Sequence, residues 1–214
     1  MKAIVIGGTG ATGKQLVEQL LSTEWISEVT LLLRKPTDRS HPKLRQVTVD
    51  FDHLKNYREV IAGDIAFSCL GTTLKAAGSK EAQWKVDYGY QLQFAEIARN
   101  NGIGTFVLLS AQNADAKSIF FYSKMKGELE KSMEALHFDK LIILQPGLLL
   151  RPGSDRFAEK VMVSLLSAFN RMGLLRKLAP LPVSRVAAAM IGSINRCKDA
   201  VTRVNNTNIK AWSE

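Results

Sequence analysis

Tyr122 and Lys126 are two side chains that could carry out chemistry together. They lie four residues apart in the stretch FFYSKMKGELEKSMEAL, whose apolar periodicity is typical of an amphipathic helix. Residues i and i+4 share one helix face, so the phenol and the ammonium would be neighbours. A phenol has a pKa of about 10 and exchanges protons at neutral pH only when a nearby cation stabilises its anion. The Y-x-x-x-K spacing alone is more typical of packing. The residues around the pair therefore decide whether it is interpreted as catalytic.

Ser110 adds a third group to this pair. It ends the apolar run TFVLLS and precedes Tyr122 by twelve residues. Hydride transfer to or from a carbonyl carbon requires a proton at the oxygen. Tyr122 would exchange that proton, Lys126 would stabilise the phenolate and bond a nicotinamide ribose, and Ser110 would hold the substrate oxygen. These three are therefore the predicted catalytic residues.

The elements that must position them alternate between strand-like and helix-like patterns over the first 150 residues. Strands are predicted at 2–6, 29–33, 46–49, 65–69, 105–110 and 140–145, and helices at 13–21, 54–61, 80–101 and 119–136. Apolar runs such as AIVI and FVLL indicate strands that are buried on both faces. The sequence predicts an α/β fold, a doubly wound parallel sheet (Rossmann fold), whose ligands bind beyond the carboxyl ends of the strands.

The turn after the first predicted strand reads GGTGATGK. Gly7, Gly10 and Gly13 fit a dinucleotide-binding turn, where glycines permit a sharp turn, close approach to a pyrophosphate and close helix packing. The stretch also fits the G-x-x-x-x-G-K core of a P-loop, but Gln15 follows in place of a magnesium-binding Ser or Thr. In both cases N–H groups at a helix N-terminus bind phosphate.

The ends of the second and third predicted strands indicate which nucleotide binds. Arg34 and Lys35 end the second strand, about 20 residues beyond the glycines. An NAD site has Asp or Glu here for the ribose hydroxyls, whereas cations suit the 2′-phosphate of NADP. The third strand ends in Asp50 and Phe51, and Asp50 could bind the adenine amino group or serve as a Walker B carboxylate. The predicted cofactor is NADP (NADPH).

The fourth predicted strand ends in SCLGTT, a turn of small residues that would let a dinucleotide cross the sheet edge. Cys69 in this turn has no histidine near it in sequence, so an inert buried thiol is favoured over a nucleophile. Cys197 is distant from it, and the three histidines are scattered. This pattern predicts no metal site and a reduced, cytoplasmic setting.

Composition excludes several classes of protein. The 214 residues are 46% hydrophobic and 23% charged, as in a globular protein. The net charge of +9 is spread along the chain without a basic run, so nucleic acid is not an expected partner. No apolar run approaches the roughly 18 residues of a membrane span, and the N-terminal MKAIVIGG lacks a signal-peptide core.

The chain resembles the atypical short-chain dehydrogenase/reductases of the extended Rossmann type, especially the Tat-interacting-protein-like oxidoreductases and their small bacterial relatives. The stretches GGTGATGK, CLGTTLKAAGSKEAQWKVDY, FVLLSAQNADAKSIFFYSKMKGELE and LQPGLLL carry the resemblance. It implies an NADP-binding fold with Ser110, Tyr122 and Lys126 in the catalytic positions and residues 146–148 along the nicotinamide. The predicted cofactor-binding residues are Gly7, Thr9, Gly10, Ala11, Thr12, Gly13, Arg34, Lys35, Asp50, Phe51, Cys69, Leu70, Gly71, Lys126, Pro146 and Leu148.

Two residues depart from the family pattern. Gln145 stands where relatives usually have Arg before Pro-Gly, and Asp87 lies near the Asn that many short-chain dehydrogenases use for proton relay. Residues 151–214 are expected to form a small cap of a single-domain protein, with helices at 157–175 and 183–194 on the carboxyl edge and a short strand near 202–204.

Three functions are compatible with these observations. The first is an NADP-dependent oxidoreductase that acts on a small carbonyl or alcohol. The second is a non-catalytic NADPH sensor on the same fold, which would regulate a protein partner. The third is a P-loop nucleotide enzyme, which Gln15 disfavours and which leaves the Ser–Tyr–Lys set unexplained.

Overall fold

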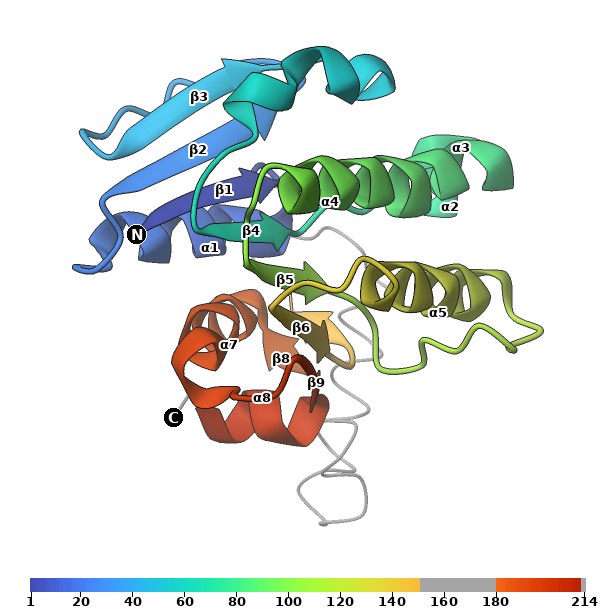
Figure 1. Ribbon diagram of the computed structural model, residues 1–214. Helices are drawn as coiled ribbons and strands as arrows, with labels where there is room; N and C mark the ends of the chain where they lie inside the picture. The colour runs from blue at the N-terminus through green and yellow to red at the C-terminus, as the bar shows by residue number, and fades with distance from the viewer. Residues whose placement is uncertain (151–179, 213–214) are drawn as a thin grey trace.

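The computed structural model describes residues 1–150 and 180–212. Their centre is a seven-stranded sheet in the order β3-β2-β1-β4-β5-β6-β9, with every neighbouring pair parallel (Figure 1). The strands are β1 (Lys2–Ile6), β2 (Glu28–Leu33), β3 (Leu44–Thr48), β4 (Ile65–Ser68), β5 (Thr105–Leu109), β6 (Lys140–Gln145) and β9 (Val201–Asn205). The predicted doubly wound sheet is confirmed.

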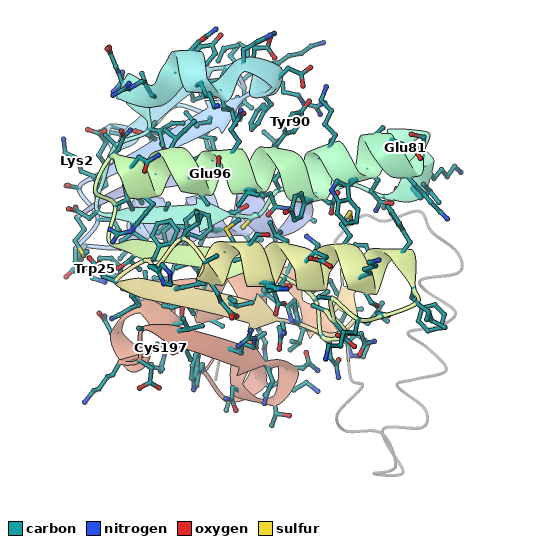
Figure 2. The ribbon with its side chains drawn as sticks, turned by 45° about the vertical axis from the view of Figure 1, so that its right-hand side comes forward. Lys2, Trp25, Glu81, Tyr90, Glu96 and Cys197 are labelled. Carbon is teal, nitrogen blue, oxygen red and sulfur yellow. The ribbon has the colours of Figure 1, made fainter. Side chains whose placement is uncertain are left out.

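Helices cover both faces of the sheet and bury its apolar strands. One face packs against α1 (Ala11–Ser22), α7 (Val183–Arg196) and α8 (Asn206–Trp212). The other packs against the 3₁₀ segment η1 (Phe51–Val60), α4 (Tyr90–Asn100) and α5 (Phe121–Glu134). Helices α4 and α5 lie side by side there (Figure 2). The strands can be apolar along their whole length because helices keep water away from both faces of the sheet.

The helix predicted over 80–101 is interrupted. The chain forms α2 (Leu74–Ala77), α3 (Lys80–Trp84), one π-helical turn η2 (Lys85–Gly89) and then α4. A π turn inserts an extra residue into a helix and changes which side chains share a face. Here the inserted turn contains Asp87, which is buried.

The described part of the C-terminal segment contains the predicted helix at 183–194 and the predicted strand near 202–204, as α7 (Val183–Arg196) and β9, whereas a cap formed by residues 151–214 stays a prediction. Helix α7 packs against α1, and β9 pairs in parallel with β6 at the sheet edge. Alternating strands and helices continue the same winding pattern, so these elements add to the layers instead of covering the carboxyl edge. The predicted helix at 157–175 lies outside the described residues. Two short strands, β7 (Leu149–Leu150) and β8 (Leu181–Pro182), form a separate parallel pair.

Phe106 on β5 tests how much the core beneath α4 and α5 contributes to stability. Its ring is buried and lies 5.9 Å from that of Phe94 and 5.0 Å from that of Phe138, between centroids. We expect Phe106→Ala to lower the free energy of unfolding by about 3–5 kcal/mol, because it leaves a cavity in a packed core. Urea denaturation measures the loss. Ile119→Ala, at a side chain that is 93% exposed, is the control and should change little.

Candidate functional site

The glycine turn after β1 leaves no room for side chains at two positions. Gly7 has φ +74°, and a Cβ atom there would lie 2.4 Å from the carbonyl carbon of Cys69, at the end of β4. A Cβ atom on Gly13 would lie 2.1 Å from the main-chain oxygen of Gly7. The turn therefore lies directly against the end of β4, and α1 packs closely on the turn. These are the two roles that a dinucleotide-binding turn gives to its first and last glycines.

The N-terminus of α1 faces the space beyond the strands. Gly10 is its N-cap, and a glycine has no side chain to bond the first N–H groups of the helix. Such groups, together with the helix dipole, suit a phosphate. The sheet order places β1 between β2 and β4, the switch point at which dinucleotides bind in this class of fold. The dinucleotide interpretation of GGTGATGK is thus favoured over the P-loop one.

A cleft of about 340 Å³ lies at this switch point. Its walls include the glycine turn after β1, the segment after β4, the end of β5 and helix α5. Among the predicted residues it is lined by Gly10, Ala11, Thr12, Cys69, Leu70, Gly71, Ser110, Tyr122 and Lys126. The three predicted catalytic residues therefore share one cleft with the predicted phosphate-binding turn.

A second cavity, of about 360 Å³, adjoins the first. The two share Leu70, Gly71 and Thr72. Arg34 and Phe51 line the second cavity, and the Phe51 ring lies 5.5 Å from that of Tyr90. The combined space runs from Ser110 and Tyr122 at one end to a guanidinium and two aromatic rings at the other. Its shape and donors fit an extended dinucleotide.

Lys126 is buried between an aromatic ring and a carboxylate. It is 3% exposed, and its Nζ lies 6.0 Å from the centre of the Tyr122 ring and 3.5 Å from Oδ1 of Asp87. Asp87 Oδ2 accepts a hydrogen bond from the Thr72 main-chain N–H at 2.7 Å. Burial raises the pKa of Asp87, and the ammonium and the Thr72 N–H oppose that shift. The sequence departure at Asp87 thus gives Lys126 a carboxylate partner.

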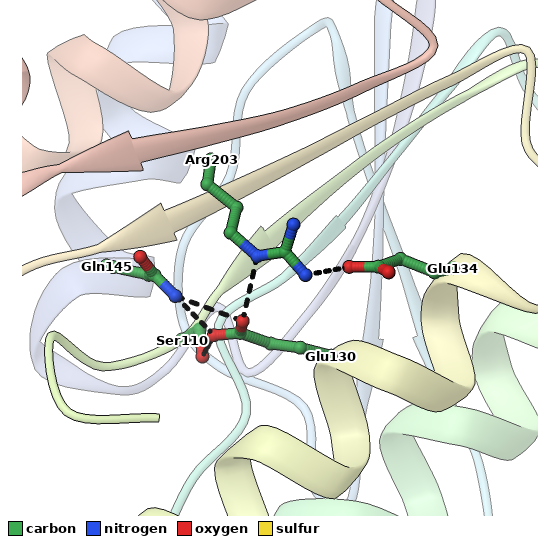
Figure 3. A network of polar contacts seen from close by, with 5 residues as sticks. All are labelled: Ser110, Glu130, Glu134, Gln145 and Arg203. Atoms are coloured by element: carbon green, nitrogen blue, oxygen red, sulfur yellow. Dashed lines mark hydrogen bonds and ion pairs between the residues drawn. The ribbon is translucent and has the colours of Figure 1, made fainter. Parts of the chain in front are cut away.

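Ser110 is hydrogen-bonded on the side away from the cleft. Its hydroxyl donates to Oε1 of Glu130, a carboxylate on α5 that is 4% exposed. Gln145 on β6 and Arg203 on β9 donate to the same carboxylate (Figure 3). Sequence reasoning missed Glu130, although it follows Lys126 by four residues on the same helix face. It could not find Arg203, because only the β6–β9 pairing brings that side chain close.

The remaining predicted residues lie outside the described walls of both cavities. Asp50 instead caps η1, accepting from Asp52 N and bonding His53 Nδ1. Lys35 and Thr9 are exposed, Leu148 is 38% exposed, and the Pro146 carbonyl accepts a bond from Gln112 N. Among residues missed by the prediction, Thr72, Thr73, Asp87 and Leu149 line the first cleft.

The environment of Cys69 keeps its thiol protonated. Burial raises the pKa of its thiol to about 12, although Lys126 opposes the shift. A thiol with that pKa stays protonated at neutral pH and is a poor nucleophile. Among the described residues no group of three His, Cys, Asp or Glu side chains is arranged to hold a metal ion.

Comparisons with known proteins agree with this geometry. Residues 7–158 match a family model described as NAD(P)H-binding. Protein HTATIP2 of Rattus norvegicus is 38% identical over 171 residues, 75% of this chain and 70% of that protein. "Protein FMP52, mitochondrial" of Candida albicans is 36% identical over 155 residues, 70% of this chain and 68% of that protein. The Bordetella bronchiseptica enzyme WbmH in complex with NAD⁺ has a TM-score of 0.71 at 15% identity, covering 99% and 78% of the two chains.

The fold and the cleft define a Rossmann-type protein of the nucleotide-binding class. The chain belongs to the NAD(P)H-binding family, and it is similar to HTATIP2. The likeness to WbmH concerns the fold alone, and the names of the two relatives state no activity or substrate. In residues 1–150 and 180–212, no helix is both long and apolar enough to cross a bilayer.

Gly13→Ala tests whether the turn forms the phosphate site. The new Cβ atom would meet the Gly7 main-chain oxygen, so the turn must shift and its N–H groups lose alignment. Loss of one charge-assisted bond should weaken binding of both NADH and NADPH by roughly tenfold or more. Fluorescence titration measures this. Gly89→Ala is the control, because its Cβ would meet no atom within 4 Å, and equal effects of the two substitutions would contradict the assignment.

Proposed function

We propose that this protein is an NADP-dependent oxidoreductase that reduces a small carbonyl compound or oxidises the corresponding alcohol. The observation that carries the proposal is the cleft in which Ser110, Tyr122 and Lys126 face the glycine turn. A site for proton exchange at a substrate oxygen thus adjoins a site for a dinucleotide. The family relationship supports the cofactor class, and the choice between NAD and NADP rests on Arg34.

The cofactor would extend along the two joined cavities. Its pyrophosphate would lie against the N–H groups at the start of α1, and the adenosine end would lie in the second cavity, against Phe51 and Tyr90. Arg34 would bind the 2′-phosphate, since its guanidinium is exposed and lines that cavity. When bound in this way, the nicotinamide supplies or accepts the hydride.

Tyr122 would exchange the proton that the reaction requires. It lines the cleft and is 45% exposed, so a substrate oxygen can reach its hydroxyl. The Lys126 ammonium, 6.0 Å from the centre of the Tyr122 ring, would stabilise negative charge that develops on the Tyr122 oxygen during proton transfer. The same ammonium pairs with Asp87. When the Asp87 carboxyl is ionised, this pairing reduces the effect of the ammonium on Tyr122. Because burial raises the Asp87 pKa, the acid form is more accessible than for an exposed aspartate.

The non-catalytic NADPH sensor remains the second candidate, and the polar contacts of the site favour it specifically. Lys126 already pairs with Asp87, and Ser110 already donates to Glu130. A site whose reactive groups are engaged within the chain could bind a cofactor without turning it over. The protein partner of such a sensor and the cytoplasmic location both stay predictions. The fungal relative from Candida albicans is named as mitochondrial.

Arg34→Ala tests the preference for NADPH. A guanidinium–phosphate bond contributes about 1.5–3 kcal/mol, so the dissociation constant for NADPH should rise roughly tenfold or more while that for NADH stays constant. Titration of both cofactors gives the two constants. Lys35→Ala is the matched control at an exposed cation outside the described cavity walls and should have a smaller effect. Equal wild-type affinities for the two cofactors would remove the basis for choosing NADP.

Tyr122→Phe separates the enzyme from the sensor. The substitution keeps the ring and its contact with Lys126 but removes the transferable proton. Turnover across a panel of small aldehydes and ketones should fall by about 10²-fold or more, the usual size of a lost general acid, with NADPH affinity little changed. Stopped-flow or steady-state loss of NADPH absorbance measures the rate.

The opposite outcome is equally informative. A Tyr122→Phe protein that reduces the same substrates at the wild-type rate shows that the phenol is not the acid. A wild-type protein that binds NADPH but turns over no member of the panel supports the sensor.

A further inference from the structure

Glu130 lies beneath the proposed reaction site and not in its walls. It follows Tyr122 by eight residues and Lys126 by four, so all three share one face of α5. Glu130 is 4% exposed, and its carboxylate bonds Ser110, the residue that follows β5. Burial of a carboxylate costs free energy unless its oxygens are hydrogen-bonded, so the hydrogen-bond partners of Glu130 indicate its role.

Each oxygen of the Glu130 carboxylate receives a hydrogen bond from a group that can only donate. Gln145 Nε2 lies 3.0 Å from both Oε1 and Oε2, and Arg203 Nε lies 3.4 Å from Oε2. The other end of the Arg203 guanidinium bonds Glu134 (Figure 3). An amide NH₂ and a guanidinium have no acceptor at these nitrogens. Both oxygens of Glu130 therefore accept hydrogen bonds, and the Arg203 guanidinium forms an ion pair with one of them.

This arrangement fixes what Ser110 can do in the cleft. A hydroxyl has one proton and two acceptor lone pairs, and the proton of Ser110 is directed to Glu130. A bond to a charged acceptor is stronger than one to a neutral carbonyl, so rotation of that proton toward a ketone oxygen is disfavoured. Toward the cleft, Ser110 thus presents an acceptor, while Tyr122 remains the donor for a carbonyl oxygen.

We infer that Glu130 is a positioning residue that makes Ser110 a hydrogen-bond acceptor, so that the site selects α-hydroxy carbonyl compounds over simple ketones. This inference rests on the proposed oxidoreductase function. The hydroxyl on the carbon beside the carbonyl donates to Ser110 Oγ, and the carbonyl oxygen accepts from the Tyr122 hydroxyl. Hydride addition at the carbonyl carbon and transfer of the Tyr122 proton to its oxygen then give a vicinal diol and a phenolate, with NADPH oxidised to NADP⁺.

Three small ketones test this selection. Hydroxyacetone can donate to Ser110, methoxyacetone places an ether oxygen at the same position and can only accept, and butanone can do neither. The wild type should reduce hydroxyacetone with a kcat/KM about tenfold or more above those of the other two, because one unpaired polar contact separates them. Equal values for hydroxyacetone and methoxyacetone in the wild type would overturn the inference, and this comparison needs no variant.

Glu130→Gln tests the origin of the selection. The neutral amide binds the Ser110 proton less strongly, so Ser110 can donate to an ether or carbonyl oxygen. The ratio of kcat/KM for hydroxyacetone to that for methoxyacetone should fall by about tenfold. A purely structural defect would lower both rates and leave the ratio unchanged, which would also overturn the inference. Glu134→Gln is the matched control: it removes the charge of the other Arg203 partner but leaves the donors to Glu130 in place.

Equilibrium binding separates failure of this inference from failure of the proposed function. If the wild type reduces no ketone or aldehyde, the proposed function fails. The recognition step is then measured directly, by calorimetric titration of the protein–NADPH complex with hydroxyacetone and methoxyacetone. Tighter binding of hydroxyacetone supports the acceptor role of Ser110, and equal binding contradicts it.

Discussion

The main chain at Gly7, just after β1, lies directly against the main chain of Cys69, just after β4. The two are so close that a Cβ atom on Gly7 would overlap with Cys69. The cleft depends on this contact. It allows the first turn of α1 to stand beside the segment after β4, so N–H groups and a small-residue wall face the same space. Because β1 and β4 are neighbours at the reversal of strand order, helices leave the sheet on opposite faces and the edge between them stays open.

The parallel arrangement explains why residues from distant parts of the sequence meet there. All seven strands end at one edge, so each strand end adds a short segment to one continuous rim. Helix α5 contributes side chains from one of its faces, whereas the strands contribute the residues at their ends. Tyr122 and Lys126 on its first turns line the cleft, and Glu130 one turn later lies under Ser110. One helix therefore sets both the charge beside the phenol and the direction of the serine proton.

The features that could be predicted from the sequence are those with local causes. Strands such as 2–6 and 140–145 have buried apolar runs between turns, and their bounds are confirmed. The grouping of Ser110, Tyr122 and Lys126 followed from one strand end and one helix periodicity, and the structure places them in one cleft. Their chemical roles stay predictions.

The features that escaped prediction depend on contacts across the fold. The π turn at Asp87 leaves no clear mark in a sequence whose helical periodicity continues on either side. The cap that Asp50 forms for η1 was not predicted, since an aspartate at a strand end can cap the next helix or bind a ligand, and binding of a nucleotide by Asp50 stays a prediction. The position of Arg203 opposite Ile143 depends on the pairing of β9 with β6, more than 50 residues apart in the chain. No local pattern specifies that register.

The two departures from the family pattern, at positions 87 and 145, gain a common physical meaning from the charges around α5. Lys126 and Glu130 are one helical turn apart and could pair with each other. Instead Lys126 pairs with Asp87 on one side, and Glu130 is held by Gln145 and Arg203 on the other. Gln145 contributes donors but no charge, and the cation comes from the edge strand β9. Each charge in the site is thus directed away from its helix neighbour, which leaves the cleft with a phenol donor at Tyr122 and an acceptor at Ser110.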